Sequence, residues 1–74
     1  MFISDLNDGD IAEIIKLPEG VGAEKLTQLG INVGAEIEKI SGSPTGKLYT
    51  IGVSERFFAI TSDVAETTEV RLKD

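Results

Sequence analysis

The side chains of this 74-residue chain that could do chemistry are carboxylates, hydroxyls and amines, because histidine and cysteine are both absent. Their absence removes the commonest general base, the thiol nucleophile and the soft metal ligands. The serines lie in predicted loops and turns, and no lysine stands at a spacing that suggests a serine–lysine pair. We therefore predict that the protein is not an enzyme.

The residues that come nearest to a metal-binding motif form an acidic segment from Asp5 to Asp10. An EF-hand calcium loop needs a glycine at its sixth position and a bidentate glutamate at its twelfth. Counted from Asp5, Gly9 is fifth and the twelfth residue is Lys16, so the segment does not fit that motif. A solvated, turn-forming surface is the first interpretation. Weak binding of a hard cation by Asp5, Asp8 and Asp10 is the alternative.

Composition and charge narrow the possible partners. Thirteen acidic residues against 7 basic ones give a formal net charge of −6, and no lysine or arginine cluster offers a local exception, so we predict no nucleic-acid binding. No apolar stretch approaches the ~20 residues that cross a bilayer, and the N-terminus lacks the features of a signal peptide. We predict a soluble protein without direct membrane insertion, whose link to any membrane comes through a partner.

The elements that must position these side chains are short and separated by glycine-containing turns. Turn signals and β-branched residues predict five strands, at residues 10–17, 35–41, 47–53, 56–60 and 68–72. A short helix is predicted at 23–29, after the first strand, and one helical turn at 61–66, before the last. This pattern favours a mainly β, SH3-like five-stranded barrel that forms a single domain over residues 1–74.

Irregular alternation marks two of these strands. The apolar positions of the first strand change parity at Ile14–Ile15, and those of the second change between Ile37 and Ile40. A β-bulge or a sharp bend would reconcile each change with a single buried face. Before the last strand, Ser62 or Asp63 is predicted to cap the helical turn.

A helix-to-strand corner is predicted at residues 26–34. Leu26 and Leu29 share one helix face, and Gly30 stands where a helix usually ends in the left-handed conformation. Ile31 is then placed to pack back on Leu26, and Gly34 supplies a second turn before the next strand.

Candidate contact residues lie on the helix and on one strand. Alternation turns Phe57 outward, where it either packs beneath a loop or is an exposed contact residue. The outer face of the helix is a mixed polar surface of Glu24, Lys25, Thr27 and Gln28. The outward carboxylates of the sheet could add a negative patch, or could simply be solvated: Glu13, Glu36 and Glu38.

The whole pattern resembles the FeoA family, small cytoplasmic accessory proteins of ferrous iron transport with an SH3-like fold. Three segments carry the resemblance: Ile3-Ser4-Asp5-Leu6 with Gly9; Leu26, Leu29-Gly30-Ile31, Gly34 and Ile37; and Phe58-Ala59-Ile60 before Asp63-Val64-Ala65. It spans residues 3–72, and its most specific part is the corner combined with the late segment.

The resemblance implies a non-enzymatic protein that binds FeoB, a membrane transporter with a cytoplasmic GTPase-like domain, and so lies peripherally at the inner membrane. The predicted partner-binding surface is the helix, with Glu24, Lys25, Thr27 and Gln28, together with Phe57 and the Pro44 loop. No cofactor is predicted. Two alternatives stay open: direct transition-metal-ion binding, with Fe(II) as the ion, and a generic SH3-like interaction module that forms homo-oligomers.

Overall fold

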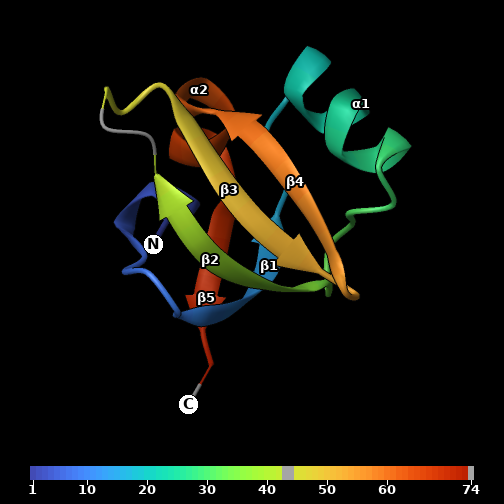
Figure 1. Cartoon of the computed structure of the whole chain (residues 1–74). Coiled ribbons are helices and arrows are strands. Elements are labelled where there is room, and N and C mark those ends of the chain that lie inside the picture. Colours follow the sequence, from blue (N-terminus) through green and yellow to red (C-terminus); the bar gives the residue numbers. More distant parts are fainter. Residues whose placement is uncertain (43–44, 74) are drawn as a thin grey trace.

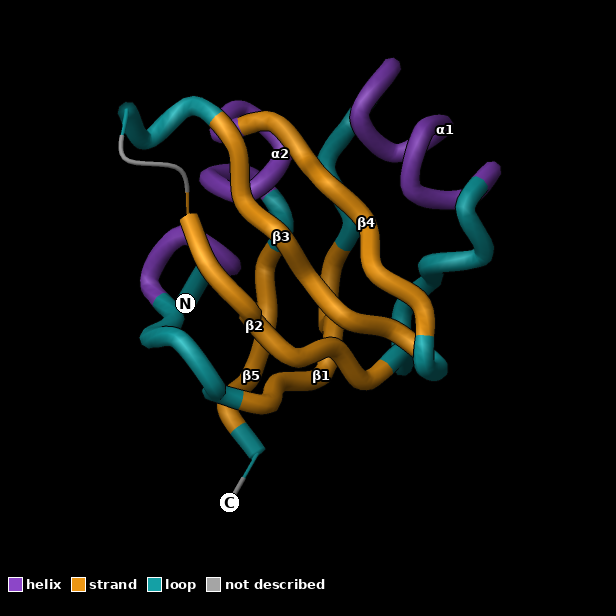
Figure 2. Tube along the Cα trace, viewed as in Figure 1, coloured by secondary structure: helices purple, strands orange, loops and turns teal. Residues whose placement is uncertain are grey.

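Five antiparallel strands form one sheet, in the order β4-β3-β2-β1-β5, that curls around a common interior (Figures 1 and 2). The structure is a computed structural model that describes residues 1–42 and 45–73. Its elements follow in chain order: η1 (Ile3–Asp5), β1 (Ile11–Lys16), α1 (Val21–Gln28), β2 (Glu36–Gly42), β3 (Leu48–Val53), β4 (Arg56–Thr61), α2 (Ser62–Thr67) and β5 (Glu69–Leu72). The predicted mainly β architecture, with a helix after the first strand and a short one before the last, is confirmed. The predicted helix at 23–29 begins two residues too late and ends one residue too late.

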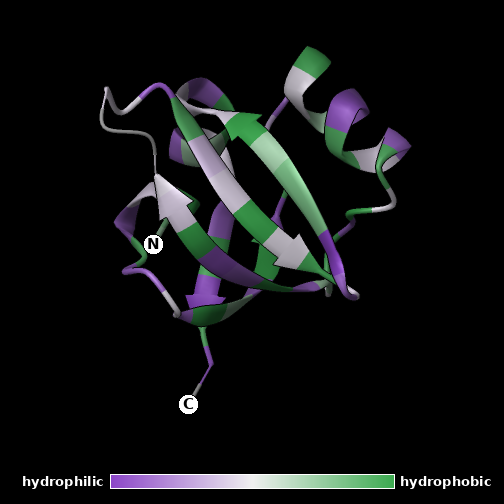
Figure 3. Ribbon diagram, viewed as in Figure 1, coloured by the Kyte–Doolittle hydropathy of each residue, from purple (hydrophilic) through white to green (hydrophobic). Residues whose placement is uncertain are grey.

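Apolar side chains from all five strands and from all three helices fill the interior. β2 carries both hydrophobic and hydrophilic residues in Figure 3, and its buried residue is Ile37. Thr68 is the buried polar residue of the described core, and its hydroxyl donates a hydrogen bond to the Val64 carbonyl at 2.7 Å. The buried hydrophobic residues are Ile3, Leu6, Ala12, Ile14, Leu26, Ile31, Ile37, Ile51, Ile60, Ala65 and Val70.

Both predicted strand irregularities are present. The register of β1 against β5 shifts between Ile14 and Lys16, and that of β2 against β3 shifts between Lys39 and Ser41. The first shift lets Ile14 stay buried while Ile15 is exposed. Such irregularities bend a strand, which allows this small sheet to curl.

The predicted cap of α2 is wrong. The N-cap is Thr61, and it makes no side-chain capping hydrogen bond. The reason is that β4 runs directly into the helix: the Ser62 N–H donates to the Lys47 carbonyl at 2.9 Å and so continues the strand pairing. Within the described residues, no helix is long and apolar enough to cross a membrane.

Candidate functional site

Backbone hydrogen bonds fix the end of α1. The Ile31 N–H donates to the Leu26 carbonyl at 2.9 Å, and the Gly30 N–H donates to the Thr27 carbonyl at 3.0 Å. These two bonds form a Schellman motif, and Gly30 adopts the left-handed conformation it requires, with φ 82°. The predicted corner is confirmed, and it buries both Leu26 and Ile31.

A narrow groove separates α1 from β4, which stand side by side in Figure 1. Leu29, at the end of the helix, remains 37% exposed, whereas Leu26 and Ile60 belong to the core. Most of the groove is apolar, and Lys25 is its charged residue. We call this recess the α1 groove; its lining residues are Lys25, Leu26, Leu29, Ala59, Ile60, Thr61 and Val64.

Lys25 makes no ion pair with any carboxylate among residues 1–42 and 45–73. The other three predicted contact residues of the helix, Glu24, Thr27 and Gln28, line a shallow hollow on α1 that Lys25 does not line. The structure therefore divides the predicted polar face, with Lys25 in the α1 groove and the other three outside it.

The remaining predicted contact residues are not brought to the helix. Phe57 is 70% exposed and lines a separate recess at the β3–β4 hairpin, with residues of β2 and none of α1. Of the two interpretations of its outward position, the structure matches the exposed one. Pro44 lies outside the described residues, so its relation to these surfaces stays a prediction.

The acidic N-terminal segment is used locally. The Asp5 carboxylate accepts the Phe2 N–H at 2.8 Å, and the Asp10 carboxylate accepts the Asn7 N–H at 2.8 Å. Asp8 instead pairs with the Lys39 ammonium at 3.1 Å. Three separate partners thus engage the three carboxylates, and residues 1–42 and 45–73 contain no cluster of three or more acidic side chains placed to hold a metal ion.

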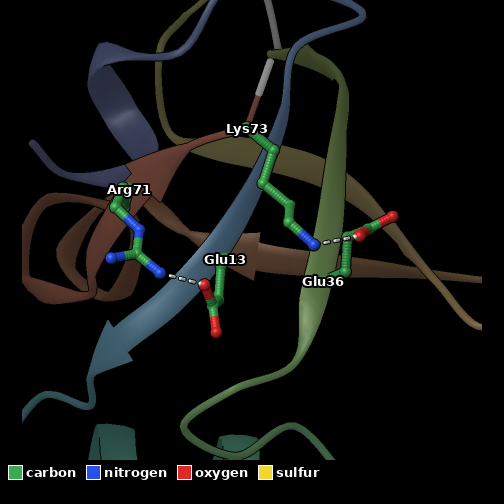
Figure 4. A network of polar contacts seen from close by, with 4 residues as sticks. All are labelled: Glu13, Glu36, Arg71 and Lys73. Atoms are coloured by element: carbon green, nitrogen blue, oxygen red, sulfur yellow. Dashed lines mark hydrogen bonds and ion pairs between the residues drawn. The ribbon is translucent and has the colours of Figure 1, made fainter.

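Two of the outward glutamates of the sheet are paired with cations of the C-terminal segment (Figure 4). Glu13 accepts a hydrogen bond from the Arg71 guanidinium at 2.6 Å, and Glu36 accepts one from the Lys73 ammonium at 2.9 Å. The hydrogen bond to Glu36, and then the negative charge of that carboxylate, raise the pKa of Lys73 above its ordinary value of 10.5. The negative patch considered from the sequence is therefore partly neutralised.

Sequence reasoning missed the groove because it joins distant residues. The sequence places Leu29 on the same helix face as Leu26, yet Leu29 remains partly exposed. The available signal is that Leu29 directly precedes Gly30, so it lies at the end of the helix. Ala59 and Val64 complete the groove from β4 and α2. Their approach to α1 depends on how the helix docks, and that docking has no local sequence signal.

The curled antiparallel sheet, the helix after its first strand and the surface recesses define a small SH3-like barrel with an adjoining groove. The FeoA domain family model matches residues 1–72, and the chain belongs to the FeoA family. No curated protein sequence matches the chain.

Solved structures share this fold. Iron(II) transport protein A from Clostridium thermocellum is 30% identical, with a TM-score of 0.88 over 97% of this chain and 45% of that one. FeoA from Chlorobium tepidum is 23% identical, with a TM-score of 0.88 over 97% of this chain and 70% of the other. A prokaryotic SH3 domain protein, Stenotrophomonas maltophilia FeoA complexed with zinc, is 22% identical, with a TM-score of 0.81 over 96% and 89%.

Proposed function

We propose that this protein is a small, non-enzymatic accessory protein of ferrous iron transport that binds the cytoplasmic part of a FeoB-type transporter. Membership of the FeoA family supports the transport role. A relative of 30% identity is iron(II) transport protein A. Binding to the transporter would hold the protein peripherally at the inner membrane, on its cytoplasmic side.

The α1 groove is the observation that carries the proposal of protein binding. Leu29 is partly exposed beside apolar groups of β4 and α2, and the recess has a volume of only about 20 Å³, so an aliphatic side chain of a partner would pack over it rather than enter it. Full burial of such a side chain contributes about 1.5–3 kcal/mol, which is the upper limit for this contact. The unpaired Lys25 ammonium would add an ion pair with an acidic residue of the partner and fix its orientation.

The polar hollow on α1, lined by Glu24, Thr27 and Gln28, is proposed as the rim of the same interface. Interfaces combine a small apolar centre with a polar, solvent-accessible border. We assign the binding energy to the groove and the specificity to this rim.

The test is a titration of the isotope-labelled protein with the soluble cytoplasmic domain of the transporter, with and without nucleotide. Leu29→Gln should weaken binding by about fivefold or more, as for an interface residue that contributes over 1 kcal/mol. Lys25→Glu should weaken it further at low salt. Lys16→Glu is the matched control, because Lys16 is also exposed, does not line the groove and makes no ion pair within residues 1–42 and 45–73. No resonance shift at high concentration, with or without nucleotide, would refute the proposal.

The alternative of direct Fe(II) binding is tested separately. The zinc complex of the Stenotrophomonas maltophilia protein shows that a relative has been solved with a transition metal. Anaerobic calorimetry with Fe(II) or Mn(II) would support direct binding here if the heat signal is lost in both Asp8→Asn and Asp10→Asn.

The second alternative, a generic SH3-like module that forms oligomers, is tested by sedimentation velocity. Phe57→Ser is the variant expected to abolish self-association.

A further inference from the structure

A second recess lies across β2, β3 and β4 at their hairpin end and shares no residue with the α1 groove. It is an open hollow of about 300 Å³. Glu38 of β2, Gly52 of β3 and Phe57 of β4 line it together. We call it the Gly52 slot.

The strand register explains its shape. Ser54 and Glu55 both have positive φ, 50° and 69°, as in a two-residue type I′ hairpin turn. That turn places Phe57 directly opposite Gly52, and the β2–β3 pairing places Glu38 opposite Gly52 on its other side. Directly opposed residues project to the same face of a sheet. The Glu38 carboxylate and the Phe57 ring therefore lie on either side of Gly52, which has no side chain.

The space above Gly52 has room for a methyl group without a clash. A Cβ atom built there would lie 3.6 Å from ring carbons of Phe57 and 3.6 Å from the Ile40 Cδ1, which is ordinary van der Waals contact. The floor of the slot is thus backbone, and apolar atoms border it. An inserted hydrocarbon chain would meet contacts rather than open water.

The charges around the slot favour a cation. Glu36, Glu38 and Glu55 line the hollow against one base, Arg56. Lys73 already pairs with Glu36, while Glu38 and Glu55 have no ion-pair partner among the described residues. The protein as a whole carries a formal charge of −6, which also favours approach of a basic partner.

An exposed aromatic ring beside a carboxylate is suited to a long cationic side chain. A cation over a ring face gains electrostatic attraction, and the methylene stem of lysine or arginine covers apolar surface while its charge stays solvated. A contact of this type also occurs within the chain, where the Lys39 Nζ lies 5.6 Å from the centroid of the Tyr49 ring.

We propose that the Gly52 slot binds a lysine or arginine side chain presented by a partner protein. The stem lies over Gly52 between Phe57 and Ile40, and the charged head lies at Glu38. This surface is separate from the α1 groove, so the inference does not depend on which protein occupies that groove.

The probe is the blocked pentapeptide acetyl-Val-Arg-Val-Arg-Val-amide, titrated into the isotope-labelled full chain and followed by NMR. Citrulline in place of both arginines gives a neutral probe of nearly the same shape. We expect the arginine peptide to shift resonances centred on Gly52 and Phe57. The citrulline peptide should bind with an affinity at least about two- to fivefold lower, because an exposed cation–π contact contributes that much.

Three variants and one control locate the binding. Gly52→Val fills the slot with a residue suited to a strand, and should reduce binding at least about tenfold, since the aromatic and stem contacts are lost together. Glu38→Gln and Phe57→Leu should each reduce it by about two- to fivefold. Gly42→Val is the matched control, because a Cβ at this other strand glycine also meets an aromatic ring at 3.6 Å, away from the slot.

Several outcomes would overturn the inference. Equal binding of the arginine and citrulline peptides would mean that the slot selects shape and not charge. Shifts centred on Lys25, or none at the highest soluble peptide concentration, would also refute it. If sedimentation velocity shows a dimer that Gly52→Val and Phe57→Leu dissociate, the occupant is a second copy of the chain instead.

Discussion

The α1 groove and the Gly52 slot are built from different kinds of residue. The groove is walled partly by the core itself, since Leu26 and Ile60 are 1% and 5% exposed. The slot is walled mainly by exposed side chains, above all Phe57 and Glu38, and the core contributes Ile37 to its lining. Their charges are opposite as well: Lys25 in the groove, and Glu38 and Glu55 in the slot, have no ion-pair partner in the part of the chain that the structure describes.

This contrast bears on how a domain of 74 residues can present two binding surfaces. So small a domain has one core and little stability to spare, about 3–5 kcal/mol. The core residues in the groove wall, Leu26 and Ile60, cannot be replaced without weakening the fold. The exposed residues of the slot, on the outer face of the sheet, can be replaced without altering the core. Binding and stability should therefore be coupled in the groove and separable in the slot.

The largest test of this coupling is Leu26→Ala. Removing a buried leucine side chain costs about 2–5 kcal/mol, so the variant should lose most of its stability and its groove together. Urea denaturation followed by circular dichroism measures the change. Val33→Ala is the control: Val33 is 60% exposed, and the change there should stay within about 0.5 kcal/mol. A loss below about 1 kcal/mol for Leu26→Ala would show that the groove wall is not part of the core.

A smaller effect is expected at the end of α1, where Gly30→Ala tests the corner that shapes the groove. Nothing lies within 4 Å of a Cβ built at Gly30, so the cost comes from the left-handed backbone alone, at φ 82°. A non-glycine residue in that conformation costs about 1–2 kcal/mol. Gly52→Ala is the control in the slot, where the backbone is not left-handed and the new methyl group makes ordinary contacts. Equal urea midpoints for the two variants would contradict this account.

The fold could be predicted from the sequence because its signals are local. The parity change at Ile14–Ile15 and the Leu26–Ile31 corner can each be read within a few residues, and both are present. Local signals failed at α2, where Thr61 is the N-cap because β4 continues into the helix without a break.

The two recesses could not be predicted in the same way, because each joins segments far apart in the chain. The pairing of Gly52 with Phe57 follows from the two-residue Ser54–Glu55 turn and could have been derived. The position of Glu38 opposite Gly52 could not, because the β2–β3 register shifts between Lys39 and Ser41. The docking of α1 on β4 likewise follows from three-dimensional packing.

Replacing the two neighbouring phenylalanines, Phe57 and Phe58, tests whether the slot can be changed without changing the stability of the fold. Phe57 is 70% exposed, so Phe57→Ser should change the free energy of unfolding by no more than about 0.5 kcal/mol. Phe58 packs against the core, and Phe58→Ser should cost about 2 kcal/mol or more. Both are measured by urea denaturation. Similar losses for the two variants would mean that the slot, like the groove, depends on the core.

The smallest expected effect concerns Glu36, the slot carboxylate that Lys73 holds. The pKa of Lys73 is raised, so the pair favours the folded state below pH 10.5, and this contribution is lost as the pH rises through the folded-state pKa. In Glu36→Gln, the pKa of Lys73 measured by NMR should move back toward 10.5, because the negative charge is gone and the amide oxygen is a weaker acceptor for the ammonium than a carboxylate.

The matching change, Lys73→Gln, leaves Glu36 in place without its cation. The slot then gains a free carboxylate, and the arginine peptide should bind up to about fivefold more tightly, as for an exposed ion pair. The gain should disappear at high salt, where exposed charges are screened. Lys16→Gln is the control, because it also removes one positive charge, but at a position outside the slot. Comparing the two variants separates a local effect from an effect of net charge. If the two variants bind the peptide equally well, net charge attracts the cation, and the Glu36–Lys73 pair plays no part in the slot.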